Sequence, residues 1–133
     1  MIQRSWQPGD TVSCEMEMEP ERVYAHPMVR ADAGCVALRR GPIIYTFEGV
    51  DNGEDLQTLR IPREAKIEAL PYQADLLEGI VALRVTGCRK KTAVNPALYA
   101  EDAAPEEMVT LRAIPYYAWC NRGMTHMRVW MQE

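Results

Sequence analysis

The chain has 133 residues, of which 47% are hydrophobic and 26% are charged, and its formal net charge is −4. This size suits one domain, or one domain with a piece of another, and the composition excludes a disordered chain. The negative charge and a single short basic run, Arg89-Lys90-Lys91, argue against nucleic-acid binding, because a phosphate-binding surface needs clustered lysines and arginines.

The first predicted element is a strand over residues 11–19. Its hydrophobic side chains alternate with polar ones and are Val12, Cys14, Met16 and Met18. Because successive side chains of a strand point to opposite faces, this period of two predicts a half-buried strand. The turn-forming Pro8-Gly9-Asp10 precedes it, and Pro20 ends it.

Further extended segments follow at short intervals. They are expected at residues 23–29, 35–38, 43–48, 56–61, 65–70, 79–87, 108–119 and 127–131. Residues 79–87 are apolar on both faces, which predicts a central strand between two layers. Residues 92–107 predict a long acidic loop, and no window gives a capped helical period. The expected fold is therefore all-β, an antiparallel, jelly-roll-like β-sandwich with little or no helix.

Aromatic residues provide the one candidate binding site. Exposed aromatic rings can stack on sugars, so we consider five residues as possible carbohydrate contacts. These are Trp6, Tyr116, Tyr117, Trp119 and Trp130. For Tyr117 and Trp119, however, the sequence favours burial in the core over an exposed platform, because they fall on the same face of the predicted strand as Leu111.

Residues for catalysis or metal binding are not grouped in the sequence. His26 and His126 lie far apart, and nucleotide-binding and nucleophile-elbow motifs do not occur. The acidic segments 51–55 and 101–107 lack the spacing of a calcium loop or of a glycosidase carboxylate pair. The four cysteines form no C-x-x-C pair, which favours buried free thiols over zinc ligands. We expect no catalytic residue, no cofactor and no metal.

Three segments resemble a known family. They are Arg-Ser-Trp-Gln-Pro-Gly-Asp-Thr-Val at residues 4–12, Val-Ala-Leu-Arg-Arg-Gly-Pro-Ile-Ile-Tyr at residues 36–45, and Ile-Pro-Tyr-Tyr-Ala-Trp-Cys-Asn-Arg-Gly at residues 114–123. Together they resemble the C-terminal region of glycoside hydrolase family 127, the β-L-arabinofuranosidase-like proteins. Thr46 stands where family members often have cysteine.

The resemblance implies an enzyme built from an (α/α)6 barrel followed by two β-sandwiches. In that family the barrel carries a cysteine nucleophile, a glutamate acid/base and a zinc ion, and none of these motifs has a counterpart in this chain. By resemblance, residues 1–28 are the terminal strands of a truncated middle sandwich, and residues 29–133 are the C-terminal sandwich.

The expected function is therefore a non-catalytic accessory domain of a family 127-like hydrolase. The alternative is a carbohydrate-binding module that uses the C-terminal aromatics. Expected partners are the catalytic barrel of a full-length enzyme and, through the N-terminal strands, a second copy in a homodimer. The chain has no apolar run long enough to span a membrane and no signal-peptide core, so a cytoplasmic location is expected, although a truncated chain would have lost such a signal.

Overall fold

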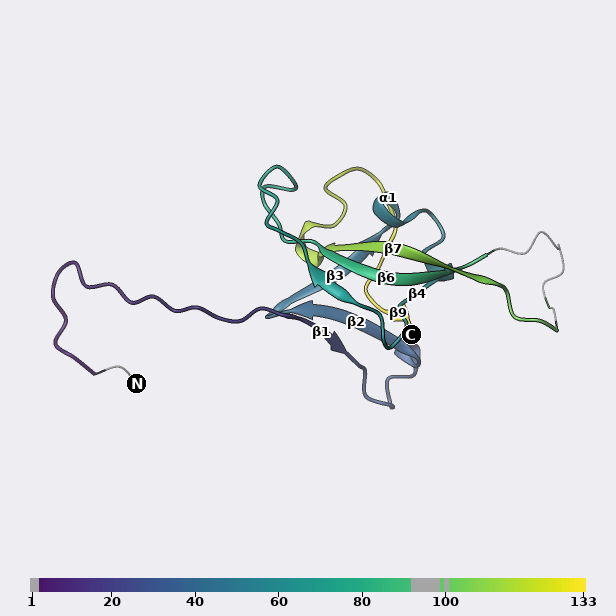
Figure 1. Ribbon diagram of the computed structural model, residues 1–133, viewed down its shortest axis with the longest axis horizontal. Helices are drawn as coiled ribbons and strands as arrows, with labels where there is room; N and C mark the ends of the chain where they lie inside the picture. Colours follow the sequence, from purple (N-terminus) through teal and green to yellow (C-terminus); the bar gives the residue numbers. More distant parts are fainter. Residues whose placement is uncertain (1–2, 92–98, 100) are drawn as a thin grey trace.

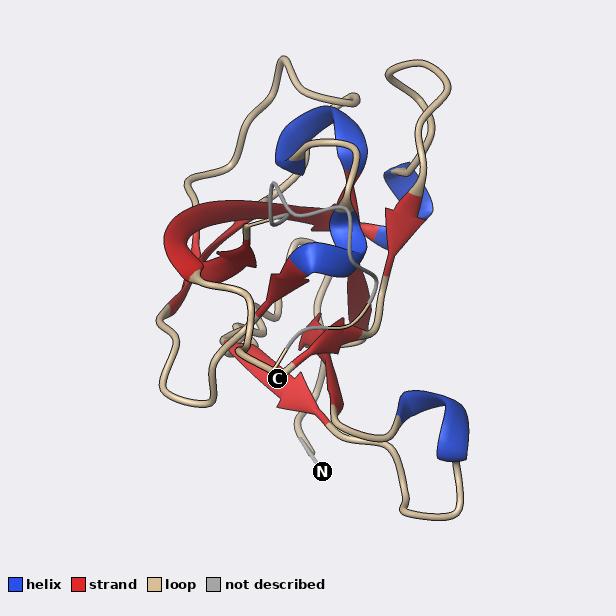
Figure 2. Ribbon diagram, turned by 90° about the vertical axis from the view of Figure 1, so that its right-hand side faces the viewer, coloured by secondary structure: helices blue, strands red, loops and turns tan. Residues whose placement is uncertain are grey.

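The computed structural model describes residues 3–91, 99 and 101–133. Its strands are β1 (Pro20–Val23), β2 (Cys35–Arg40), β3 (Ile43–Glu48), β4 (Leu59–Arg60), β5 (Ile67–Ala69), β6 (Leu83–Lys90), β7 (Glu106–Pro115), β8 (Met127–Arg128) and β9 (Met131–Gln132). Helical turns are α1 (Gly49–Asn52), η1 (Arg30–Asp32), η2 (Leu56–Thr58) and η3 (Tyr116–Ala118). Figure 2 shows these short turns outside the strands. The all-β prediction is confirmed.

The strands form one hydrogen-bonded path that closes on itself. Its order is β1-β2-β9-β4-β6-β7-β3-β8, with β5 beside β6. Because β2 pairs with β3 as well as with β9, the path returns to β2. In Figure 1, β1 and β2 make the lower layer and β6 and β7 the upper one, which gives the two layers of a sandwich.

The main core fills the space between the layers. It is formed by Val36, Leu38, Tyr45, Phe47, Leu56, Leu59, Ile61, Leu83, Val85, Leu111, Ala113 and Met131. β6 lies between β4 and β7, pairing with β7 over eight residues, so the predicted central strand is confirmed although it begins only at Leu83.

A second, smaller core lies beneath the hairpin formed by residues 70–82. It contains Ile80, Ala82, Ile114 and Ala118, with Leu70, Leu76 and Leu77 packed against them. Backbone hydrogen bonds from Leu70 to Ala82 and between Gln73 and Ile80 hold the hairpin together. This core attaches the hairpin to the end of β7 and to η3.

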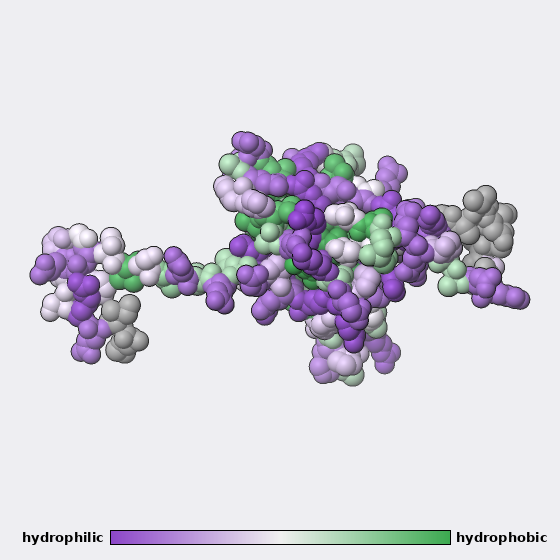
Figure 3. All heavy atoms as spheres, in the orientation of Figure 1, coloured by the Kyte–Doolittle hydropathy of each residue, from purple (hydrophilic) through white to green (hydrophobic). Residues whose placement is uncertain are grey.

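The strand predicted at residues 11–19 is absent, and that prediction is wrong for this structure. Residues 3–19, called the tail from here on, extend away from the body before β1 (Figure 1). Figure 3 shows hydrophobic atoms in the tail well clear of the body. The alternating pattern marks side chains that favour a core, but a strand also needs a partner with which to share hydrogen bonds, and the described residues supply none there.

The strand predicted at residues 108–119 is also too long. β7 ends at Pro115, and the chain turns into η3 directly after it. A proline has no N–H to donate to a ladder, so the strand stops where it occurs. Tyr117 and Trp119 consequently leave the core face of the strand, and their expected burial is wrong.

Other predictions are confirmed only in part: of residues 23–29 only Val23 lies in a strand, and residues 65–70 form the shorter β5. Residues 56–61 form η2 before the short β4, and residues 127–131 divide into β8 and β9. The predicted loop at 92–107 includes residues 92–98 and 100, which lie outside the described residues, and its last two residues belong to β7.

Candidate functional site

Three of the five predicted aromatic residues lie at one corner of the sandwich. Tyr116 and Tyr117 lie in η3, Trp119 follows it, and these side chains are 45%, 65% and 36% exposed. We call these three residues the aromatic corner. Beneath them, Ala118 is buried in the smaller core, so the turn is fixed by one apolar side chain while its aromatic rings face water.

A buried carboxylate anchors the turn that follows. Glu48, at the end of β3, is 0% exposed and accepts a hydrogen bond from the Cys120 backbone N–H at 2.6 Å. It also forms an ion pair with Arg122, which pairs in addition with Asp51. The hydrogen bonds that Arg122 donates to Asp51, and then those to Glu48, raise the pKa of its guanidinium. Burial of an unpaired carboxylate would cost several kcal/mol, so these contacts are what allow Glu48 to be there.

Asn52 ties the same region to β7. Its side-chain amide donates to the backbone oxygens of Glu48 at 2.9 Å and Arg112 at 2.8 Å, and its Oδ1 accepts from the Arg112 N–H at 2.8 Å. All the polar atoms of this buried side chain therefore have partners on β3 and β7. The result is a rigid base for the turn at residues 119–123.

An open pocket of about 500 Å³ lies beside this turn. It is lined by Leu77, Glu78, Asn121 and Arg122. Among the described residues, the non-glycine residues with positive φ are Leu77 at 50°, Glu78 at 62° and Cys120 at 65°, and all three lie at or beside this pocket. A left-handed conformation costs a side-chain-bearing residue roughly 1–2 kcal/mol. Backbone strain of this kind collects at functional sites.

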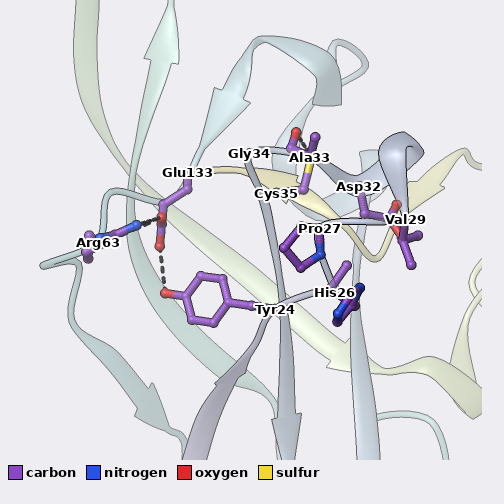
Figure 4. Close-up of a pocket in the computed structure, with 11 residues that line it drawn as sticks. Tyr24, His26, Pro27, Val29, Asp32, Ala33, Gly34, Cys35, Arg63 and Glu133 are labelled. Carbon is purple, nitrogen blue, oxygen red and sulfur yellow. Dashed lines mark hydrogen bonds and ion pairs between the residues drawn. The ribbon is translucent and has the colours of Figure 1, made fainter.

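A second pocket lies between the loop that follows β1 and the C-terminal residue Glu133 (Figure 4). It measures about 360 Å³, and its polar centre is Glu133, which accepts from Tyr24 Oη at 2.7 Å and from Arg63 Nη2 at 2.6 Å. His26 and Cys35 also line it. The chain's own side chains already bind this carboxylate, which leaves little of it for a ligand.

The remaining candidate residues lie elsewhere. Trp6 is exposed on the tail, with the Arg4 guanidinium 5.1 Å from its ring centre. Trp130 lies half-buried between β8 and β9. The structure thus brings together three of the five predicted contacts.

Sequence reasoning missed Glu48 and Arg122, although Arg122 stands in one of the segments that carried the family resemblance and Glu48 closely follows another. Two features of the sequence could have indicated this ion pair: a single carboxylate at the end of an apolar strand, and an arginine in a turn motif. A buried charge requires an opposite charge beside it, so the two could have been paired. It also missed the exposure of two thiols: all four cysteines are free, but only Cys35 and Cys88 are buried, while Cys14 and Cys120 are exposed.

Within the described part of the chain, no three histidine, cysteine, aspartate or glutamate residues are grouped to hold a metal ion. Over the same residues, no helix is long and apolar enough to cross a membrane.

Comparison with known proteins places these features in context. The sequence profile described as the glycoside hydrolase family 127 C-terminal domain matches residues 20–132. A non-reducing end β-L-arabinofuranosidase from Bifidobacterium longum subsp. longum is 38% identical over 132 residues, covering 94% of this chain and 20% of that protein.

Two solved structures are similar to the chain. A GH127 β-L-arabinofuranosidase from Geobacillus stearothermophilus T6 is 50% identical, with a TM-score of 0.83 over 87% of this chain and 18% of that one. A second GH127 β-arabinofuranosidase is 32% identical, with a TM-score of 0.73 over 87% of this chain and 17% of that one. The chain therefore spans about a fifth of the length of these relatives.

Proposed function

The chain belongs to glycoside hydrolase family 127, as its C-terminal domain, and we propose that it is an accessory sandwich that stabilises the catalytic part of such an enzyme. One observation carries the proposal: the family match covers residues 20–132, nearly the whole chain, yet the chain spans only about a fifth of its relatives. The catalytic partner would be the barrel that the rest of a family 127 chain forms.

A fusion tests this role. The chain would replace the matching C-terminal part of the Geobacillus enzyme, and the comparison is the same enzyme ended before that part. If the domain stabilises the catalytic part, the fusion keeps its arabinofuranosidase activity longer than the shortened enzyme at raised temperature. Equal rates of inactivation in the two proteins would contradict the proposal.

We propose that the tail belongs to the middle sandwich predicted for residues 1–28. Its exposed stripe of Val12, Cys14 and Met16 supports this, because such a pattern suits a strand of another core. β1 pairs with β2 from Pro20↔Arg40 to Val23↔Ala37, which favours a division just before β1 rather than at residue 28.

In the isolated chain, the same stripe supports a homodimer formed by exchange of the N-terminal strands. Unpaired strand edges with apolar side chains favour pairing with another copy. Light scattering at high micromolar concentration should show a dimer that disappears when residues 1–19 are removed. A stable monomer would contradict the exchange. A cytoplasmic location remains a prediction from the sequence.

Carbohydrate binding is the second candidate function. The exposure of Tyr116, Tyr117 and Trp119 favours it, because solvent-facing aromatic rings can stack on sugar rings. Trp6 and Trp130 remain part of this proposal. Titration of the chain with L-arabinose and arabino-oligosaccharides, followed by tryptophan fluorescence, should then show a saturable change that Trp119→Ala abolishes. No saturable change would contradict it.

A further inference from the structure

Building on the proposed function, we infer that the aromatic corner is the surface against which the domain preceding residue 20 packs in a family 127 chain. The proposed role says that the chain stabilises the rest of the enzyme. This inference says where the contact is made, and it commits to one occupant, the upstream part of the same polypeptide.

The position of the corner supports this occupant. The tail enters the body at the β2–β3 turn, where the Met18 side chain lies over Gly41, 2.8 Å from where a Cβ would be. β3 leaves that turn and pairs with the end of β7 through Tyr45↔Pro115, directly before η3. In Figure 1 the tail and the end of β7 lie at the same end of the body, and the end of β6 and the start of β7 lie at the other.

The length of chain outside this domain also supports it. About four-fifths of the Bifidobacterium relative lies outside the match, and the matching profile describes a C-terminal domain, so the remainder precedes it in the family. An upstream domain that is connected through the tail would therefore lie nearest to the end of the body at which the aromatic corner is found.

The chemistry of the corner fits a protein interface. Taken together, the exposed parts of these three residues amount to roughly 300 Å² of surface. A surface of this size can form the centre of an interdomain contact of ordinary size. Tyrosine, tryptophan and arginine are the residues that contribute most at such centres, and Arg122 lines the adjoining pocket.

The arrangement of the rings favours a protein over a sugar. A 3₁₀ turn has three residues per turn, so the side chains of Tyr116 and Tyr117 diverge by about 120°. Rings that diverge around a turn suit insertion into a shaped partner surface, whereas stacking on one sugar chain requires a shared plane. The buried Glu48 fixes the turn directly after η3, through Cys120 and Arg122, so the chain that follows the rings is already held in place and docking would cost less entropy.

Reaction of the Cys120 thiol tests the inference directly, because this exposed thiol lies next to Trp119. A maleimide would be applied to the isolated chain and to the Geobacillus fusion, and its attachment would be followed peptide by peptide by mass spectrometry. We expect Cys120 to react at least ten times more slowly in the fusion. The control is a Tyr99→Cys variant, since Tyr99 is exposed in the β6–β7 connection and should react equally fast in both proteins.

A second measurement uses stability. Tyr117→Ser should leave the unfolding temperature of the isolated chain almost unchanged but shorten the half-life of the fusion's activity, whereas Tyr99→Ser should change neither. The inference is overturned if the fusion is stabilised but Cys120 is not protected in it and Tyr117→Ser has no effect. The proposed function would still stand in that case. A fusion no better than the shortened enzyme overturns both. Protection of Cys120 by an arabino-oligosaccharide in the isolated chain, without protection in the fusion, would assign the corner to sugar binding instead.

Discussion

Glu48 is a charged residue that is fully buried. Its neighbours along β3, Tyr45 and Phe47, are fully buried in the main core, and Thr46 is buried on the other face. Thr46 is satisfied by donating to the Arg128 backbone oxygen at 3.1 Å. Glu48 is satisfied by Cys120 and Arg122, so the polar face of β3 serves to hold the turns that surround it.

Replacing Glu48 by glutamine should destabilise the domain by about 2–3 kcal/mol, because the shape is kept but the charge that opposes Arg122 is lost. This lies somewhat below the cost of breaking a fully buried pair, since Arg122 retains Asp51. Urea unfolding measures the loss. The matched control is Glu21→Gln, which breaks the exposed pair with Arg39 and should cost less than about 0.5 kcal/mol. Equal losses for the two variants would mean that Glu48 is not an anchor.

Glu133 should respond to pH through its partners. Hydrogen bonds from Arg63 and then Tyr24 hold the pKa of its carboxyl below the ordinary value of 4.5. A pKa that is lowered by folding adds stability above the unfolded value, and this stability is lost as the pH falls through the folded pKa. NMR titration should therefore find the Glu133 midpoint below 4.5, and Arg63→Gln should move it upward.

The control for this titration is Lys90→Gln at the end of β6, which should leave the Glu133 midpoint where it is. A midpoint that Arg63→Gln does not shift would show that the contacts of Figure 4 do not hold the carboxylate.

At the scale of single residues, sequence reasoning identified residues 79–87 as a central strand, because apolar side chains on both faces of a strand indicate burial directly. It did not pair Glu48 with Arg122, since the two are far apart in the chain and only the folded structure brings them together. Tyr117 and Trp119 were assigned to the core because the alternation was continued through Pro115, where the strand stops.

Among the elements, the tail shows how much a strand depends on its partner. Residues 11–19 have the clearest alternation in the sequence, yet they form no strand, whereas the less regular β1 does, because β2 offers it a free edge. Pattern predicts which side chains favour a core, and the arrangement of the neighbouring strands decides whether a ladder forms.

Removal of residues 1–19 should therefore leave the free energy of unfolding of the domain unchanged within about 0.5 kcal/mol, since exposed residues away from packed features contribute little. Chemical denaturation of the shortened and full chains, both at concentrations where the chain is monomeric, measures the difference. A loss of several kcal/mol would show that the tail packs on the sandwich in solution.

Unlike the tail, the hairpin formed by residues 70–82 and the turn η3 both have packing partners. Ile80 of the hairpin and Ala118 of η3 are buried in the same smaller core, which holds the aromatic corner in place without a further strand. The left-handed residues Leu77 and Glu78 persist there because the surrounding packing fixes the turn.

For the whole molecule, the motif resemblance was sufficient to identify the family and the all-β fold. The profile match and the superposition with the Geobacillus enzyme confirm both. The exposed corner could not be derived in this way, because whether an aromatic side chain faces water depends on where η3 begins, which no periodicity encodes.

The role proposed for this sandwich is to serve a catalytic part that it does not itself contain. It is tested most directly by hydrolysis of p-nitrophenyl β-L-arabinofuranoside, measured in parallel for the purified chain and for its fusion to the Geobacillus enzyme. We expect release of p-nitrophenol by the fusion and a rate equal to the buffer blank for the chain alone at any concentration. Release that rises in proportion to the chain and follows it through every purification step would contradict it.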